Sequence, residues 1–383
     1  LIFTSRKLPN PLHIVSLVAS GTGKTHLQEK VGDLIPQEDK LEITVLSENA
    51  FYYFGQRELK HKLILIEDLD GAENALYPLR ELQTKKRISK TVAHKNSRGE
   101  TKTVHLVVEG PLSVAGCTTR EQIYEDNANR SFLIYLDESK EQDERIMNYQ
   151  RAASAGRVNK EAERKAAKIL SNAQRVLEPI LVVNPFAELL KLPAEIFKPR
   201  RTNGHYLQFI EVVTFYNQYQ REKKADEDTG EIYIETTLED IAEANRLMKQ
   251  VLIRKSDELT GACRNYLESI KAYLQNENKT KFTNREVRKA LKVNESNQKR
   301  WTLSLLYNYY IKRVKGTKSK GYEYEITGYQ EYQKLQEQIG NVLDETLESL
   351  RNAVEKETVG KRSSVVQKKN EPRKQKKVKA VAQ

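Results

Sequence analysis

Short apolar runs alternate with polar segments of helical spacing over the first 140 residues. Continuous apolar runs bounded by turn residues are typical of buried strands, whereas apolar positions three to four apart are typical of helices. Residues 88–108 alternate as a β-hairpin whose turn falls at 96–99. This order predicts an α/β sheet that binds its ligand at the carboxyl ends of the strands. We predict strands at 12–18, 41–46, 63–66, 112–115 and 132–136, and a helix over 72–86.

Helical spacing dominates the next part of the chain. Residues 143–198 are rich in Ala, Glu, Lys and Arg, and prolines break the pattern at 179, 185 and 193. Two further helices are predicted at 207–222 and 238–252, joined by a polar loop over 223–231. These segments predict a helical linker followed by a small helical domain.

A different pattern covers residues 282–326. Thr283 and Glu286 have the spacing of a capping box that opens a short helix, a second helix follows around 296–311, and a hairpin with a Gly- and Lys-rich tip ends the pattern. Two helices followed by a basic hairpin predict a winged helix-turn-helix. Trp301 and Tyr307 lie at helical spacing and are predicted to be core residues. A surface helix is predicted over 332–356.

The apolar run at 12–18 leads into V-A-S-G-T-G-K-T, residues 18–25, which a helix can follow. Strand, glycine turn, Lys-Thr and helix is the arrangement that cradles the phosphates of a nucleoside triphosphate. Lys24 would reach the terminal phosphates, and the Thr25 hydroxyl would bind Mg²⁺. Val18 stands where the full pattern has glycine, and a chance glycine turn is the alternative. The predicted ATP-binding residues are Ser20, Gly21, Thr22, Gly23, Lys24, Thr25 and His26.

Acidic residues follow the apolar strand at 63–66, in the order Glu67, Asp68, Leu69, Asp70. Carboxylates at such a strand end can hold the Mg²⁺ water shell and orient an attacking water. We assign Glu67 and Asp68 to these two roles. Their order is the reverse of the usual one, so the sequence leaves open which carboxylate has which role. Asp70 is better explained as a cap of the next helix.

Two more strand ends carry candidate catalytic residues. Thr118 and Thr119 end the next strand, where a hydroxyl can position the lytic water beside the γ-phosphate. Arg130 lies just before the last strand, where a side chain tends to face a neighbouring subunit. There it could stabilise phosphoryl charge in trans, or it could form an ordinary surface salt bridge.

Composition and charge narrow the class of protein. The 383 residues carry a net charge of +12, with 38% hydrophobic and 31% charged residues, which is typical of a soluble, helix-rich protein of several domains. No apolar stretch is long enough to span a membrane. Cys117 and Cys263 lie far apart, so we expect neither a disulfide framework nor a zinc site, and a cytoplasmic location. The chain begins with Leu1, so we expect it to be the back half of a longer polypeptide.

Much of the positive charge lies near the C-terminus. Residues 361–379 contain nine basic residues and one acidic residue. A disordered, solvated tail that weakly binds polyanions is predicted there.

The order of phosphate loop, Glu-Asp strand end, hairpin, Thr strand end and N-R-S-F-L-I-Y-L-D-E resembles the AAA+ ATPase core of the minichromosome maintenance (MCM) type. The resemblance implies a homo-oligomeric, hexameric ring in which Arg130 is the arginine finger and the hairpin enters the channel. Residues 207–213 and E-T-T-L-E-D-I-A-E-A-N-R-L-M are similar to that family's helical lid. In the lid Arg200, Arg201 and His205 are candidates for sensor 2. The sequence does not decide among these three residues, and we name Arg201 as the nucleotide-binding candidate.

The segments N-P-F-A, K-P-R-R-T and Y-N-Q-Y-Q-R-E, followed by a winged helix, most resemble the C-terminal helicase-like half of mobile-element or phage primase proteins. Such proteins carry zinc-finger and Toprim primase domains upstream. The resemblance covers 11–326. We therefore expect an ATPase core at 1–142, a helical linker and lid at 143–257, a winged-helix domain at 258–330, and a helix with a disordered basic tail at 331–383.

Two basic clusters are candidates for binding single-stranded or forked DNA. An ordinary solvated turn is the alternative for the first cluster, and a protein-docking module is the alternative for the second. The hairpin cluster comprises Lys90, His94, Lys95, Arg98 and Lys102. The winged-helix cluster comprises Lys299 and Arg300 on the second helix and Lys312, Arg313, Lys315, Lys318 and Lys320 in the wing.

These features together predict a ring-forming, ATP-driven DNA helicase or translocase from the replication module of a mobile element or phage. Two alternatives remain at this point. One is a replication initiator or loader that hydrolyses ATP without processive unwinding. The other is a DNA-binding scaffold that holds nucleotide without turnover.

Overall fold

A computed structural model describes residues 1–17, 23–44, 46–95, 101–118, 130–136, 140–196, 198–317 and 321–369. Within these ranges no helix combines the length and the apolar character that crossing a membrane requires.

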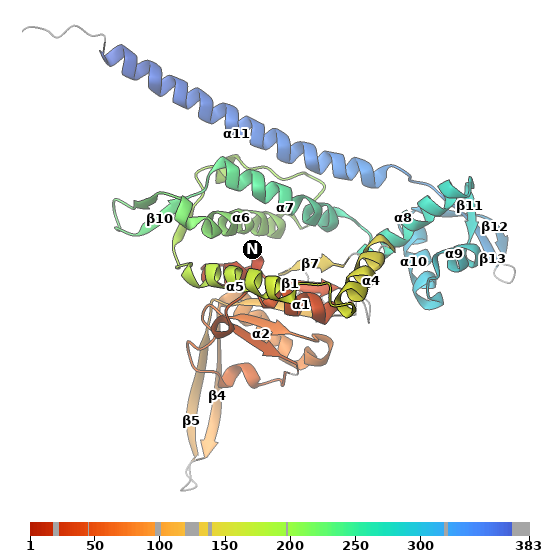
Figure 1. Ribbon diagram of the computed structural model, residues 1–383, viewed down its shortest axis with the longest axis horizontal. Helices are drawn as coiled ribbons and strands as arrows, with labels where there is room; N and C mark the ends of the chain where they lie inside the picture. The colour runs from red at the N-terminus through yellow and green to blue at the C-terminus, as the bar shows by residue number, and fades with distance from the viewer. Residues whose placement is uncertain are drawn as a thin grey trace, which may run out of the picture.

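A five-stranded parallel sheet forms the centre of the N-terminal part (Figure 1). All five predicted strands are present, although several are shorter than predicted. The order β2-β3-β6-β1-β7 places β6 between β1 and β3. Because the strands are parallel, their carboxyl ends meet at one edge and their amino ends at the other. The strands are β1 (Ile14–Leu17), β2 (Lys40–Ile43), β3 (Leu63–Ile66), β6 (Ser113–Thr118) and β7 (Phe132–Tyr135).

Among the described residues of this part, two helices and four short 3₁₀ helices accompany the sheet. The helix predicted at 72–86 begins as a 3₁₀ turn and becomes α-helical only from Leu76. Leu76, Leu79 and Leu82 are buried against the sheet, which explains the helical spacing in the sequence. The helices are α1 (Lys24–Gly32) and α2 (Leu76–Lys85), and the 3₁₀ helices are η1 (Ile2–Lys7), η2 (Gln37–Asp39), η3 (Ala50–Tyr53) and η4 (Asp70–Ala75).

The predicted hairpin is a long ribbon that projects from the body of the molecule (Figure 1). It consists of β4 (Arg87–Lys95) and β5 (Thr101–Glu109), paired antiparallel from Arg87↔Glu109 to Lys95↔Thr101. The chain then passes through Gly110–Leu112 directly into β6. The ribbon is therefore attached to the central strand of the sheet.

The helical unit, residues 160–256, contains three helices and a small sheet that the sequence patterns missed. Residues 181–183 lie in the segment predicted to be helical, and 223–225 in the predicted polar loop, yet both form strands. Pro179 and Pro185 stop helix formation on either side of Leu181–Val183, and this strand then pairs parallel with β10. The elements are α5 (Lys160–Val176), β8 (Leu181–Val183), η5 (Ala187–Leu189), α6 (Pro199–Tyr216), η6 (Gln218–Gln220), β9 (Lys223–Ala225), β10 (Ile232–Glu235) and α7 (Leu238–Ser256), with α4 (Lys140–Ser154) ahead of them.

The helical unit packs against the amino ends of the strands. Leu8 and Leu12, before β1, and Phe132, the first residue of β7, share one hydrophobic core with α6 and α7. The ring of Phe132 lies 6.0 Å from the ring of Phe209 in α6. Phosphate-loop residues follow the other, carboxyl end of β1, so the helical unit and the phosphate loop lie at opposite ends of this strand.

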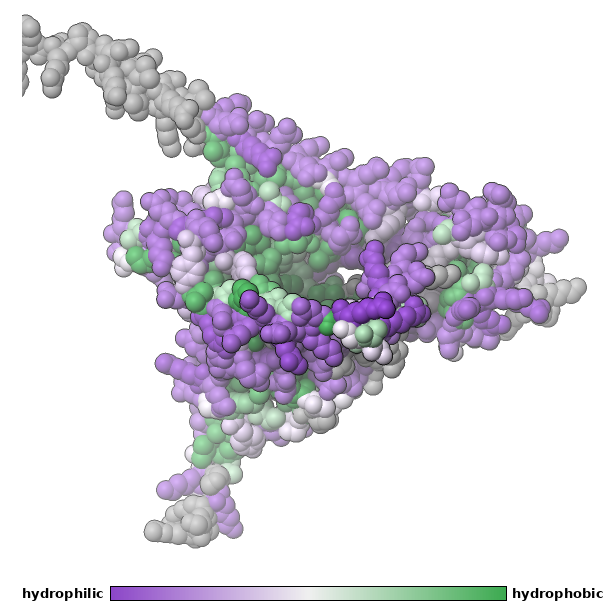
Figure 2. All heavy atoms as spheres, in the orientation of Figure 1, coloured by the Kyte–Doolittle hydropathy of each residue, from purple (hydrophilic) through white to green (hydrophobic). Residues whose placement is uncertain are grey.

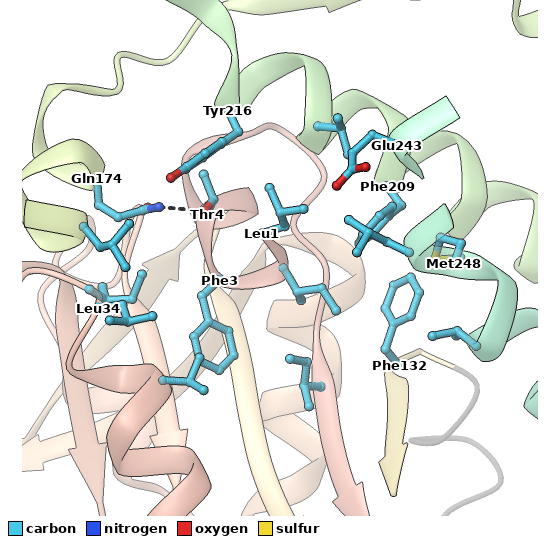
Figure 3. A pocket seen from close by; sticks show the side chains of 18 of the residues that line it. Leu1, Phe3, Thr4, Leu34, Phe132, Gln174, Phe209, Tyr216, Glu243 and Met248 are labelled. Carbon is cyan, nitrogen blue, oxygen red and sulfur yellow. Dashed lines mark hydrogen bonds between the residues drawn. The ribbon is translucent and has the colours of Figure 1, made fainter. Parts of the chain in front are cut away.

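An apolar cavity of about 650 Å³ lies between the sheet and the helical unit. In Figure 3, Phe3, Leu34 and Phe132 line it from one side, and Phe209 and Met248 from the other. Figure 2 shows hydrophobic side chains within the hollow between the two parts. The cavity lies at the amino ends of the strands, so it is separate from the predicted phosphate site.

Burial of Glu211 in α6 gives a prediction about pH. Burial raises the pKa of its carboxyl to about 7 from 4.5, although Lys86 opposes the shift. Between these values the unfolded chain releases this proton and the folded chain keeps it. The free energy of unfolding should therefore fall as the pH rises from about 4.5 to 7. Urea unfolding of Glu211→Gln should lack this part of the pH dependence, and exposed Glu195→Gln should retain it. Equal slopes in both variants would contradict the assignment.

Residues 258–330 have the order of elements that the sequence predicted, with an added helix and strand in front. The three strands form an antiparallel sheet in the order β11-β13-β12. The predicted capping box is confirmed, because the Thr283 backbone N–H donates to Glu286 Oε2 at 2.9 Å and the Glu286 N–H donates to Thr283 Oγ1 at 3.3 Å. The elements are α8 (Gly261–Asn276), β11 (Lys281–Thr283), α9 (Asn284–Leu291), α10 (Glu295–Tyr307), β12 (Ile311–Thr317) and β13 (Gly321–Ile326).

The two aromatic residues predicted for this core differ in burial. Trp301 is half-buried and its ring lies 5.2 Å from that of Tyr266 in α8. Tyr307 is 83% exposed, so its assignment to the core was wrong. It lies on the same outer face of α10 as exposed Leu303, whereas Thr302 and Leu305 lie on the buried face.

The C-terminal helix α11 (Glu331–Lys369) was predicted as a surface helix, and the structure shows that one face of its first half is buried. Ile339, Leu343, Leu347 and Leu350 are buried in the core that contains α7. The first residues of the predicted disordered tail, 361–369, continue the helix, and 370–383 lie outside the described residues. Helix α11 thus returns to the helical unit across the top of Figure 1.

A buried arginine joins α7, residues 258–330 and α11. Arg264 in α8 donates two hydrogen bonds, of 2.7 and 2.6 Å, to the Asp257 carboxylate that follows α7. Its guanidinium lies 4.7 Å from the ring of Tyr310 and 4.6 Å from that of Tyr332, at the start of α11. Both charged side chains are almost completely buried.

Removing one partner of this pair should destabilise the protein strongly. Arg264→Met would leave the Asp257 carboxylate buried without its charge partner, which typically costs about 3–5 kcal/mol. The free energy of unfolding in urea measures the effect. The exposed pair of Arg246 with Glu243 supplies the control, since Arg246→Met should cost less than about 1 kcal/mol. Similar losses in the two variants would contradict a structural role for the buried pair.

Candidate nucleotide-binding site

The predicted phosphate loop joins β1 to α1. Gly23 has a left-handed backbone, with φ +93°, and precedes the first residue of α1. Glycine adopts this conformation without steric cost, so the local structure explains the residue. Lys24 and Thr25 open α1, and exposed His26 lies in its first turn. Ser20, Gly21 and Thr22 lie outside the described residues, as do the side chains of Lys24 and Thr25.

The predicted carboxylates lie at the carboxyl end of β3. Glu67 and Asp68 are both exposed there. Asp68 Oδ1 accepts a 3.0 Å hydrogen bond from the Asp70 backbone N–H. Asp68 therefore contacts the backbone at the start of η4. The Asp70 carboxylate accepts a hydrogen bond from the Thr118 hydroxyl.

Thr118 ends the strand between β1 and β3. It is buried, and it lies opposite Leu17, the last described residue before the phosphate loop. The predicted Thr118 is thus next to both the loop strand and the acidic strand. Thr119 lies outside the described residues.

Gln28 is a residue of this region that the sequence patterns missed. Its side-chain amide donates to the carbonyls of Ile66 at 3.3 Å and Ala115 at 3.2 Å, and its oxygen accepts from the Cys117 thiol at 2.9 Å. It thereby ties α1 to β3 and β6. The only signal in the sequence is its position one helical turn after Lys24.

A second cavity, of about 210 Å³, opens beside these strand ends and is lined by Gln28, Glu42 and Glu67 among others. Among the described residues, no group of three or more His, Cys, Asp or Glu side chains could enclose a metal ion. Mg²⁺ commonly needs only one or two carboxylates when a nucleotide and water supply the other oxygens. Exposed Glu67 and Asp68 fit that requirement.

The predicted arginine finger lies at the opposite edge of the sheet. Arg130 precedes β7, whose first residue Phe132 lies opposite Ile14, the first residue of β1. Its Nε donates to Thr84 Oγ1 at 3.1 Å, near the end of α2. The phosphate loop follows the far end of β1, so Arg130 and the loop of the same chain lie at different edges.

The sensor 2 candidates lie on this amino edge as well. Arg200 and Arg201 are exposed in the first turn of α6. One turn later the His205 ring stacks on Phe132 at 5.2 Å, and Lys255 Nζ lies 2.8 Å from its Nδ1. Burial and then the Lys255 charge lower the pKa of His205 to about 3. A neutral, packed imidazole is poorly suited to bind phosphate, so the arginines are the better candidates.

The basic hairpin cluster is divided between its base and its outer part. Lys95 and Lys102 are exposed on the outer part of the ribbon. Lys90 instead donates to Asn49 Oδ1 at 2.6 Å and lies 5.4 Å from the Tyr52 ring, so its prediction as part of the turn cluster was wrong. Arg98 and the His94 side chain lie outside the described residues.

The basic residues of the second cluster lie on α10 and β12. Lys299 and Arg300 are exposed on α10, and Lys315 is exposed on β12. Two neighbours on β12 have partners: Lys312 Nζ lies 3.1 Å from Glu325, and the Arg313 guanidinium lies 4.5 Å from the Tyr322 ring. The wing-tip candidates Lys318 and Lys320 lie outside the described residues.

Comparison with known families agrees with the strand–loop–helix arrangement. Residues 3–179 match the model of the MTBMA_p00010 P-loop domain family. Comparison with curated proteins gave no match. The matched range contains the whole parallel sheet, the glycine loop and the carboxylates that follow β3. The first half of this chain therefore contains an α/β P-loop NTPase domain, which binds nucleotide.

Proposed function

We propose that this protein is a ring-forming, ATP-driven DNA helicase or translocase of the MCM-like AAA+ type. We propose further that it is the helicase part of a cytoplasmic mobile-element or phage primase-helicase that acts in replication. One observation carries the proposal. The exposed basic ribbon β4–β5 leads directly into the amino end of β6, and the carboxyl end of β6 adjoins both the strand before the phosphate loop and the strand before the carboxylates.

The nucleotide site supports ATP hydrolysis with Mg²⁺. Backbone N–H groups of residues 20–23 and the Lys24 side chain would hold the phosphates, and Thr25 would bind the metal. Glu67 and Asp68 would complete the Mg²⁺ shell and orient the attacking water, with Thr118 and Thr119 beside it. Bound Mg²⁺ would neutralise charge on the transferred phosphoryl group.

Subunit contacts are needed to complete this site. Arg130 and Arg201 lie at the amino edge of the sheet, away from the phosphate loop of their own chain. In a ring, the amino edge of one subunit can face the nucleotide of the next, where arginine stabilises the transition-state charge. We propose a hexameric homo-oligomer in which each seam holds one ATP.

The ribbon would contact single-stranded DNA in the ring channel. Lys95, Arg98 and Lys102 can bind backbone phosphates without reading sequence. Because β5 continues into β6, a change at the γ-phosphate can move the ribbon. The region 258–330, which we propose to be a winged helix, would add DNA contacts through Lys299, Arg300, Lys315 and Lys318.

Removing positive charge from the hairpin should weaken the stimulation of ATP hydrolysis by DNA. In Lys95→Ala/Arg98→Ala, stimulation of ATP hydrolysis by single-stranded DNA should fall about tenfold, because fewer phosphates are neutralised. The dependence of log affinity on log salt should flatten by about one to two units. Phosphate release measured with and without DNA separates stimulation from the basal rate. Lys160→Ala/Lys165→Ala on α5 is the control, and unchanged stimulation in the hairpin variant would contradict the proposal.

Strand displacement on a forked duplex tests the activity itself. A helicase should release the labelled strand in an ATP-dependent reaction under multiple-turnover conditions. ATP hydrolysis without displacement would favour an initiator or loader instead.

A further inference from the structure

Two tyrosines at one corner of residues 258–330 are the most exposed large hydrophobic side chains among the described residues. Tyr307, at the end of α10, is 83% exposed, and Tyr309, in the turn to β12, is 85% exposed. Leu303, one helical turn before Tyr307, is 53% exposed. We call these three residues the tyrosine patch. Single exposed apolar residues are common, but neighbouring ones indicate an interaction surface.

The backbone at Tyr309 does not require a tyrosine. Its φ is +60°, a left-handed conformation that is costly for a bulky residue. Its N–H donates to the Leu306 carbonyl at 3.2 Å, and its carbonyl accepts from the Thr327 hydroxyl, so the turn is held in place. This turn directs the next residue, Tyr310, inward against Arg264. Glycine would make the same turn at lower cost, so the ring at 309 needs another explanation.

The surroundings of the patch are basic. Residues 258–330 contain fifteen Lys and Arg and seven Asp and Glu, a net charge of +8. On α10, Lys299 and Arg300 are exposed and precede Leu303 and Tyr307 at helical spacing. Residues four apart lie on one face of a helix, so Lys299, Leu303 and Tyr307 form a single row. The row changes from cationic to aromatic along the helix.

We propose that the tyrosine patch stacks on unpaired nucleic-acid bases while Lys299 and Arg300 contact the adjoining phosphates. The proposal rests on the proposed action on DNA and specifies its ligand as single-stranded rather than duplex. Unpaired bases expose their faces and can stack on aromatic rings, whereas paired bases are already stacked within the duplex. The positive charge favours a polyanion over an apolar protein partner.

Binding of single-stranded and duplex oligonucleotides to the full chain tests the proposal. Fluorescence anisotropy should show about a tenfold to hundredfold loss of single-strand affinity in Tyr307→Ala/Tyr309→Ala, since each stacked base contributes substantially. Duplex affinity should change less than about twofold. Tyr307→Phe/Tyr309→Phe should retain the single-strand affinity, because the ring rather than the hydroxyl stacks. The salt dependence should stay unchanged, because the phosphate contacts remain.

Exposed Tyr77→Ala on α2 is the matched control and should bind both oligonucleotides as the unmodified chain does. Thermal unfolding of each variant verifies that the fold is intact. Unchanged single-strand affinity in the alanine variant, with normal binding by the unmodified chain, would overturn this proposal while leaving the helicase proposal standing. A change in oligomeric state with unchanged DNA affinity would overturn it in favour of self-association. If the unmodified chain bound neither oligonucleotide, both proposals would fail.

Discussion

Lys24→Ala should reduce magnesium-dependent ATP hydrolysis about 100-fold or more. The lysine is the positive side chain expected at the terminal phosphates, where charge grows as the phosphoryl group is transferred. Preorganised charge at such a position commonly contributes two to three orders of magnitude to the rate. The measurement is steady-state phosphate release under multiple-turnover conditions with saturating ATP.

Lys30→Ala supplies the matched control for this variant. Lys30 is exposed in the same helix but near its far end, at some distance from the phosphate loop. We expect it to hydrolyse ATP at the rate of the unmodified chain. Hydrolysis by Lys24→Ala at that same rate would refute the assigned site, and no hydrolysis by the unmodified chain would favour the nucleotide-holding scaffold.

Arg130→Ala should also reduce ATP hydrolysis strongly, by about 1000-fold if it supplies an arginine finger. The physical reason is loss of the cation that would stabilise transition-state charge across a subunit seam. Arg87→Ala is the control, because exposed Arg87 also lies at the amino edge, at the start of β4. Its hydrolysis should stay close to that of the unmodified chain.

Mixing the two inactive variants tests whether Arg130 acts on the neighbouring subunit. A mixed ring contains seams that pair an intact Lys24 from one subunit with an intact Arg130 from the next. Hydrolysis should therefore recover in part when Lys24→Ala and Arg130→Ala are combined, and it should not recover with either variant alone. An inactive mixture that still forms mixed rings by sedimentation would contradict action in trans.

Local patterns predicted the central sheet because most of its strands contain short apolar runs. Leu63–Ile66 is buried throughout, so four consecutive apolar residues indicated a strand without any knowledge of its partners. The three-residue strands β8 and β9 could not be recognised this way. They depend on pairing with β10 from another part of the chain, which no local spacing records.

Long-range packing also decides which helix faces are buried. Ile339, Leu343 and Leu347 have helical spacing, but only contact with α7 shows that their face is covered. Tyr307 also lies at helical spacing, yet it belongs to the outer face of α10, opposite the buried Thr302 and Leu305. Amphipathic spacing identifies a helix face that can be buried, but it does not show whether another part of the chain covers that face.

The candidate-site residues that directly follow an apolar strand could be predicted from the sequence. The glycine turn and the carboxylates after β3 could be identified because each directly follows an apolar strand. Gln28 could not, since its role depends on the carbonyls of Ile66 and Ala115 from two other strands. The position of Arg201 could not be predicted either, because it follows from the packing of α6 against the amino ends of the strands.

The return of α11 to α7 gives residues 258–330 two covalent attachments to the same body. The segment leaves from the end of α7 and comes back through α11, and Arg264 connects both junctions. It is an insertion within a continuous structural unit rather than an appendage on a single tether. Two attachments restrict rotation of this segment about either one. Tension on a DNA strand bound to residues 258–330 would therefore be transmitted to α7 and α11.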